Sequence, residues 1–137
     1  MNNMHFTLAY WCLLVAAFLP IACALIAKSG MFNRPRREGG YDNNHPRAWL
    51  ARQTDWRARA NAAQANTFEA LPFFFAAVII AHQLGAVQLR VDIFCFVWVV
   101  LRALYIIMYV GDMPKARSTV WAIALVVNSV ILFAGYR

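Results

Sequence analysis

Polar side chains recur at helical spacing inside two otherwise apolar stretches of the sequence. Asn66 and Glu69 stand three residues apart in NAAQANTFEALPFF, and Arg102, Tyr105 and Tyr109 stand three and four residues apart in LRALYIIMYV. Side chains at these spacings lie on one face of an α-helix. Arginine binds carboxylates in a bidentate manner, and tyrosine offers a hydroxyl beside an apolar ring. With a carboxylate that accepts from an ammonium group, this set suits a small zwitterionic peptide, and the lipid side leaves room for an apolar co-substrate.

Three further residues extend this candidate site. Arg59 lies two turns before Asn66 on the same predicted helix face, and Gln64 lies to one side of that face. Arg117 follows the turn-forming residues GDMP and begins the last apolar segment. The predicted topology therefore places Arg117 at the same membrane face as Glu69.

The elements that must position these residues are membrane helices. The chain of 137 residues is 62% hydrophobic and 14% charged, with a mean hydropathy of +0.51, whereas a soluble domain is about half apolar and a quarter charged. Four apolar segments each approach the roughly 20 residues that cross a bilayer, where helices satisfy their own backbone. We predict an all-α fold, an integral membrane four-helix bundle with a single domain over residues 1–137. The predicted helices span about residues 5–28, 55–84, 91–111 and 116–136.

Positive charge is concentrated between the first two predicted helices. The net charge is +7, from 13 Lys and Arg against 6 Asp and Glu, and eight of the 13 lie between the first two apolar segments. Basic loops mark the cytoplasmic side, so we predict a basic cytoplasmic connection at about residues 28–56 and both termini on the opposite side. In a bacterium this means the inner membrane, with periplasmic termini. The connection is expected to be a solvated loop with lipid headgroup contacts, or alternatively to fold some of its arginines over a site at the membrane face.

Two other classes of site are disfavoured by the same patterns. Confinement of the charge to one connection favours a cytoplasmic loop over nucleic-acid binding. Cys12, Cys23 and Cys95 lie in apolar runs without metal-ligand spacing, so neither a metal site nor a disulfide framework is predicted.

Arg102 lies inside a predicted membrane helix, where a charge needs a partner. We place no other acid inside an apolar segment, so Glu69 is the expected partner. In a purely structural interpretation this ion pair fixes packing, the two tyrosines are interfacial aromatics, and Asn66 and Asn128 form hydrogen bonds between helices. Convergence of these groups at one membrane depth favours a polar pocket that opens to the cytoplasm.

Two stretches resemble a known family. AQANTFEALPFF, residues 63–74, is similar to the Asn-x-x-Glu-x-x-Pro signature of the MAPEG superfamily, the membrane-associated proteins in eicosanoid and glutathione metabolism. RALYIIMYVGDMPKAR, residues 102–117, is similar to its Arg- and Tyr-rich third helix and the turn that follows. The resemblance covers nearly the whole chain, and DNNHPRA in the first connection resembles the bacterial branch. It implies a homotrimer that holds glutathione, as co-substrate, between neighbouring subunits near the cytoplasmic face.

The resemblance also implies roles for individual residues. Arg117 resembles the arginine that stabilises the glutathione thiolate in enzymatic members and is the predicted catalytic residue. Several enzymatic members carry an arginine at the position of Ala62, and Arg59 would substitute for it by reaching back. The residues predicted to bind glutathione are Asn66, Glu69, Arg102, Tyr105, Tyr109, Arg59 and Gln64.

The leading hypothesis is a membrane-bound, glutathione-dependent transferase or peroxidase of the microsomal type, which acts on lipophilic electrophiles or hydroperoxides. Two alternatives stay open. One is a non-catalytic lipid- or ligand-binding protein of the same family, which Ala62 favours, and the other is a structural four-helix scaffold. The expected partners are a lipophilic small molecule, membrane lipids and further copies of the chain in a homotrimer.

Overall fold

The computed structural model describes residues 5–137, and every regular element among them is helical. Four long helices are each long and apolar enough to cross a membrane. The predicted all-α four-helix bundle is therefore confirmed. The long helices are α1 (Leu8–Lys28), α3 (Asp55–Gln83), α4 (Gln88–Val110) and α5 (Pro114–Leu132), and the first connection contains the 3-10 helix η1 (Arg36–Glu38) and the short helix α2 (Pro46–Ala51).

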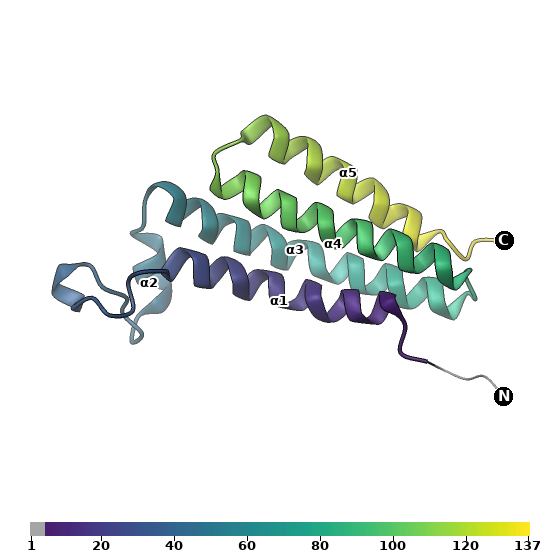
Figure 1. Cartoon of the computed structure of the whole chain (residues 1–137), viewed down its shortest axis with the longest axis horizontal. Helices are drawn as coiled ribbons and strands as arrows, with labels where there is room; N and C mark the ends of the chain where they lie inside the picture. The colour runs from purple at the N-terminus through teal and green to yellow at the C-terminus, as the bar shows by residue number, and fades with distance from the viewer. Residues whose placement is uncertain (1–4) are drawn as a thin grey trace.

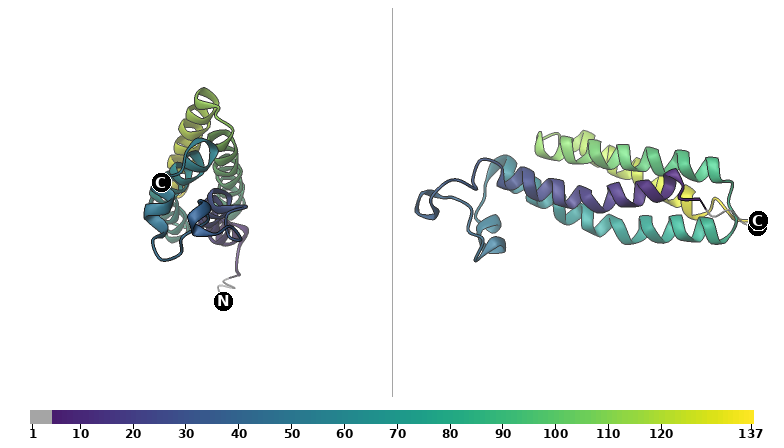
Figure 2. Two further views of the ribbon diagram at one scale, coloured as in Figure 1. Left: turned by 90° about the vertical axis from the view of Figure 1, so that its left-hand side faces the viewer. Right: turned by 60° about the horizontal axis from the view of Figure 1, so that its bottom comes forward.

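The long helices lie side by side, with α3 and α4 between α1 and α5 (Figure 1). Both central helices contact both outer ones, and α1 packs most closely on α3 while α5 packs most closely on α4. The α1–α3 connection projects from one end of the bundle, and the α4–α5 turn lies at that same end (Figure 2). The start of α1, the α3–α4 turn and the end of the chain lie at the opposite end (Figure 1). Polar residues near the start of α3, the end of α4 and the start of α5 are thereby brought to one half of the bundle.

Proline and a left-handed residue shape the turns around the candidate site. Pro114 occupies the first turn of α5, where its missing N–H costs no hydrogen bond. Asp112 takes the left-handed conformation (φ 58°) in the α4–α5 turn, whereas Gly111 does not need its conformational freedom (φ −76°). Aspartate tolerates this region better than most residues. The turn therefore reverses the chain within a few residues and sets Arg117 back against α4.

The start of α3 and the end of α5 each have a distinctive geometry. Thr54 is the N-cap residue of α3, and Asp55 lies in the first turn with a φ of 54°. The last helix ends at Leu132 instead of about residue 136, because the chain turns toward the α3–α4 turn. A Cβ placed on Gly135 would lie 2.6 Å from the Leu84 Cβ, so glycine permits this close approach.

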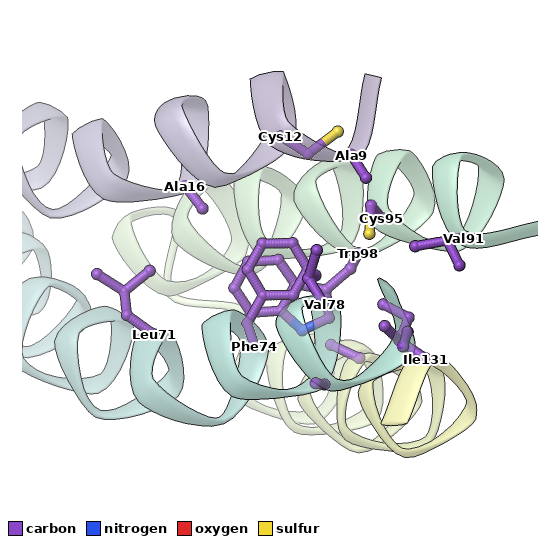
Figure 3. Close-up of a cluster of buried hydrophobic side chains, with 13 residues drawn as sticks. Ala9, Cys12, Ala16, Leu71, Phe74, Val78, Val91, Cys95, Trp98 and Ile131 are labelled. Atoms are coloured by element: carbon purple, nitrogen blue, oxygen red, sulfur yellow. The ribbon is translucent and has the colours of Figure 1, made fainter. Parts of the chain in front are cut away.

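The core is built from small side chains and one aromatic stack. Phe74 of α3 and Trp98 of α4 stack face to face, with ring centroids 3.8 Å apart and an interplanar angle of 4° (Figure 3). Small residues of α1 that are fully buried in this core let the helix backbones approach closely, which is how membrane helices commonly associate. These residues include Ala9, Cys12 and Ala16.

The start of α1 is anchored to α4. Asp92 Oδ1 accepts the backbone N–H of Ala9 at 2.8 Å and also the Gln88 side-chain amide at 2.8 Å. A carboxylate at a helix N-terminus satisfies a free backbone donor and opposes the positive end of the helix dipole. The outer helix α1 is therefore fixed at this end by a polar contact as well as by packing.

The first connection is mostly exposed, and it also contains specific side-chain contacts. The Tyr41 ring packs edge-on against Trp49, and the Lys28 ammonium lies 4.6 Å from the centroid of the Tyr41 ring. The Trp49 indole N–H donates to the Gly39 carbonyl at 3.2 Å. The arginines of this connection line neither of the cavities described below, so within residues 5–137 they do not fold over the candidate site.

Candidate functional site

Two adjoining cavities lie among α3, α4 and α5, and they share Asn66 and Trp121. We call them the inner cavity, of about 190 Å³, and the outer cavity, of about 290 Å³. The inner cavity is lined by Asn66, Glu69, Ala70, Phe73, Trp98, Arg102, Trp121, Ala124, Leu125 and Asn128. The outer cavity is lined by Asn66, Tyr105, Tyr109, Arg117, Ser118 and Trp121.

Arg102 is buried between α3 and α4, with 1% of its side chain exposed. Its Nη2 donates to Asn66 Oδ1 at 3.0 Å and to Thr67 Oγ1 at 3.1 Å. The guanidinium also lies 4.3 Å from the centroid of the Tyr105 ring. All of these partners are neutral, so within residues 5–137 the positive charge of Arg102 has hydrogen bonds but no counter-charge.

The expected ion pair between Glu69 and Arg102 is wrong for the part of the chain that the structure describes. Both residues line the inner cavity, but Glu69 is exposed, and none of the ion pairs among residues 5–137 joins them. The rotation of α3 explains the difference, because Asn66 and Thr67 face α4 at the level of Arg102. The carboxylate of Glu69 is left free to contact a ligand or another chain.

Arg117 and Tyr109 form the second cationic group of the site. The Arg117 guanidinium lies 4.1 Å from the centroid of the Tyr109 ring, a cation–π geometry that fixes its position. The Tyr109 ring in turn packs edge-on against Tyr105, with centroids 5.6 Å apart. The structure therefore brings Arg117 of α5 and the two tyrosines of α4 to one cavity.

Comparison with protein-family models decides the family. The model of the MAPEG family matches residues 8–136, which is nearly the whole chain. The chain belongs to the MAPEG family. Neither the curated proteins nor the solved structures compared with the chain gave a match.

Membership identifies this MAPEG protein as an integral, multi-pass membrane protein of the glutathione and eicosanoid metabolism superfamily. The exposed apolar side chains that cover the outside of all four long helices agree with this assignment, since lipid is their natural surrounding. An uncompensated cation inside such a bundle is costly, and intramembrane ionisable groups of this kind mark functional sites.

Two of the predicted site residues of the MAPEG protein lie away from the cavities. Arg59 Nε donates to the carbonyl of Val110 at 3.0 Å, so this arginine caps the end of α4. Gln64 is half-buried on α3 and lines neither cavity. Arg59 does not occupy the place of an arginine at Ala62, and roles for Arg59 and Gln64 toward a ligand stay predictions.

Several residues of the site were missed by the pattern of the sequence. Thr67 gave no signal, because threonine is common in apolar helices, yet it is fully buried beside Arg102. Asn128 was expected to form a hydrogen bond between helices, but its Oδ1 is buried without a hydrogen-bond partner among residues 5–137, and the residue lines the inner cavity. Trp98 and Trp121 complete the walls. No group of His, Cys, Asp or Glu among residues 5–137 is arranged to bind a metal.

Proposed function

We propose that this MAPEG protein is a membrane-bound, glutathione-dependent transferase or peroxidase of the microsomal type, with lipophilic electrophiles or hydroperoxides as co-substrates. One observation carries the proposal. Arg102 and Arg117 line adjoining cavities that share Asn66, and no carboxylate within residues 5–137 pairs with either arginine. A buried cation is stabilised by an anion, and glutathione offers two carboxylates and a thiolate.

The two cavities suit glutathione in complementary ways. The guanidinium of Arg117 would bind or stabilise the thiolate, since a nearby cation lowers the pKa of a thiol and favours its nucleophilic form. Tyr105 and Tyr109 would supply hydroxyl groups, and Asn66 would serve an amide of the peptide. Glu69, exposed at the inner cavity, would accept the ammonium group.

The surroundings of the site support a shared assembly in the membrane. The single chain leaves Glu69 exposed on a helix that is long and apolar enough to cross a membrane, and a free carboxylate inside a bilayer is costly. We propose that a neighbouring subunit of a homotrimer covers this side and completes the glutathione site. The connection end, which carries most of the arginines, would face the cytoplasm of a bacterial inner membrane, with both termini periplasmic.

A conjugation assay tests the catalytic role of Arg117. The protein in detergent is expected to conjugate glutathione to a generic aryl chloride, and Arg117→Ala should lower kcat/KM by about 100-fold, the scale for loss of one group that stabilises a developing anion. Lys115→Ala is the matched control, because Lys115 is an exposed cation of the same helix that lines neither cavity. Equal activity of Arg117→Ala and Lys115→Ala would overturn this role.

A second candidate function is non-catalytic ligand binding, and Arg59 is the observation that favours it. Arg59 is held at the Val110 carbonyl, so the position of Ala62 is not filled by a neighbouring cation. Glutathione or a lipid would then bind without turnover. Thermal protection by glutathione that is lost in Glu69→Gln, together with no measurable conjugation, would support this function over the enzymatic one.

A further inference from the structure

The end of α4 has one backbone carbonyl that the following turn does not pair. The last four carbonyls of an α-helix have no partner within the helix. Backbone N–H groups of the α4–α5 turn donate to three of these carbonyls in α4, at 2.9 to 3.2 Å, namely those of Ile107, Met108 and Tyr109. The fourth carbonyl belongs to Val110, the last residue of α4. Its partner must come from another part of the chain or from solvent.

Arg59 of α3 supplies that partner. Its Nε donates to the Val110 carbonyl at 3.0 Å, and the start of α3 and the end of α4 lie at the same end of the bundle (Figure 1). The side chain of Arg59 is half-buried, and none of the ion pairs within residues 5–137 includes it. A cation is favourable there, because the last carbonyls carry the negative end of the helix dipole. The backbone of the turn sets its own shape, whereas the bond from Arg59 fixes the turn against a different helix.

This turn separates the two members of the second cationic group. Tyr109 lies in the last turn of α4, and Arg117 lies in the first turn of α5, where its N–H donates to the Met113 carbonyl at 2.9 Å. The 4.1 Å between the Arg117 guanidinium and the centroid of the Tyr109 ring therefore depends on how the turn sets α5 against α4. The attraction between a cation and a thiolate falls with their separation. A displaced turn would weaken the effect of Arg117 on a thiol in the outer cavity.

We propose that Arg59 is a positioning residue for Arg117. By holding the Val110 carbonyl, Arg59 fixes the α4–α5 turn against α3 and thereby keeps the Arg117 guanidinium at the outer cavity. Arg59 itself lines neither cavity, so it acts through Arg117 and not by contact with glutathione. This inference deepens the proposed function and rests on it for the role of Arg117 toward the thiolate.

Two substitutions of similar length isolate the hydrogen bond. In Arg59→Gln an amide nitrogen stands at the place of Nε and can still donate, whereas Arg59→Met has no donor. Arg57→Met is the matched control. Arg57 also begins α3 and donates to backbone carbonyls, those of Ala27 and Ser29, but these lie at the first connection and not at the α4–α5 turn. Arg59→Ala, with the best helix former, replaces Arg59→Met should that variant not fold.

Amide hydrogen exchange tests the position of the turn without any ligand. Exchange of residues 111–117 should rise in Arg59→Met, stay near the unmodified level in Arg59→Gln and remain unchanged in Arg57→Met. Unchanged exchange in Arg59→Met would overturn the proposal. Because this measurement needs no glutathione, it decides the matter even if the proposed function fails.

The pKa of the bound glutathione thiol tests whether Arg59 acts through Arg117. It is measured from the ultraviolet absorbance of the thiolate across a pH series, with S-methylglutathione as the blank, and needs no turnover. Arg59→Met and Arg117→Ala should each raise this pKa, and the double variant should match Arg117→Ala alone, since contacts in one chain of action are not additive. An unchanged pKa in Arg59→Met, or additive increases in the double variant, would contradict the assignment.

Turnover separates this inference from the proposed function. At neutral pH, kcat/KM for conjugation to an aryl chloride should fall about tenfold in Arg59→Met, the factor for one hydrogen bond, with little change in KM for glutathione. A higher KM with unchanged kcat would indicate direct binding by Arg59 and defeat the positioning role. A raised thiol pKa in Arg59→Met without conjugation by the unmodified protein would keep that role and defeat the enzymatic function. Conjugation with no change of the thiol pKa in Arg59→Met would do the reverse.

Discussion

Arg102 donates to Asn66 across the α3–α4 interface, from Nη2 to Oδ1 at 3.0 Å. This bond joins the arginine of the third predicted helix to the asparagine of the family signature, and Glu69 takes no part in it. The guanidinium is thereby held in place and keeps its full positive charge for an anion. The predictions below follow from this arrangement and from the contacts that support it.

Replacing Asn66 by aspartate should give Arg102 a counter-ion within the protein, which would compete with an anionic ligand. Asn66→Asp places a carboxylate beside the buried Arg102, so the free protein should gain Tm while its affinity for glutathione falls at least tenfold. Thermal denaturation and a glutathione titration measure the two effects. Asn61→Asp adds the same charge to α3 outside both cavities and should leave the affinity unchanged. An unaltered affinity in Asn66→Asp would count against an anionic ligand at Arg102.

Thr67 should contribute to stability through its hydroxyl. Thr67 Oγ1 accepts from Arg102 and donates to the Ala63 carbonyl at 2.7 Å. Thr67→Val removes the hydroxyl at nearly constant volume and should lower the free energy of unfolding by about 1–3 kcal/mol, the scale for leaving a buried polar group unpaired. Thr67→Ser keeps the hydroxyl and should restore most of the loss. Unfolding in mixed micelles provides the measurement, and equal stability of the valine and serine variants would be inconsistent with this contact.

Loss of the Asp92 carboxylate should loosen the start of α1. Asp92→Ala removes the acceptor of the Ala9 N–H and should cost about 1 kcal/mol, as loss of a helix cap does. Amide hydrogen exchange should rise in the first turn of α1 and stay unchanged in α5. Asp92→Asn retains a side-chain oxygen and should show a smaller increase. Uniform exchange across all helices in Asp92→Ala would indicate global destabilisation instead.

The order of the first connection should depend on pH through Asp42. The backbone N–H of Asn44, which donates to Asp42 Oδ1, is the main cause of a lowered pKa for this carboxyl, with smaller contributions from His45 and Arg36. A lowered pKa in the folded chain gives stability that is present above the ordinary aspartate pKa of about 3.9 and is lost as the pH falls through the folded value. Amide exchange of residues 41–45 should therefore accelerate in acid. Asp42→Asn should remove that pH dependence.

Hydropathy was sufficient to predict the fold. Each long helix is an apolar run of membrane-spanning length. In lipid the backbone polar groups of such a run must be satisfied within the segment, and an α-helix does this. The helix ends were less predictable, as the early end of α5 shows. Its cause is the close approach of Gly135 to Leu84, a contact between segments far apart in the sequence.

The sequence predicted which residues belong to the candidate site better than it predicted which of them contact each other. Helical spacing alone grouped Asn66 with Glu69, and Arg102 with the tyrosines, and all of them line the two cavities. Spacing does not give the rotation of one helix against another, which decides that Arg102 meets Asn66 and Thr67 instead of Glu69. The position of Arg59 was missed for the same reason, because its backbone partner lies on α4.

Arg57 gives the first connection a property that its sequence does not suggest. From α3, its Nη1 donates to the carbonyl of Ala27 at 2.9 Å and to that of Ser29 at 2.7 Å, so it ties the two ends of the connection together. The segment between them is therefore a loop whose two ends are held together by side-chain hydrogen bonds. A protease cut within residues 34–44 should leave the α1 fragment bound to the remainder. The connection is therefore a suitable place to insert a reporter or to assemble the protein from two separately expressed pieces.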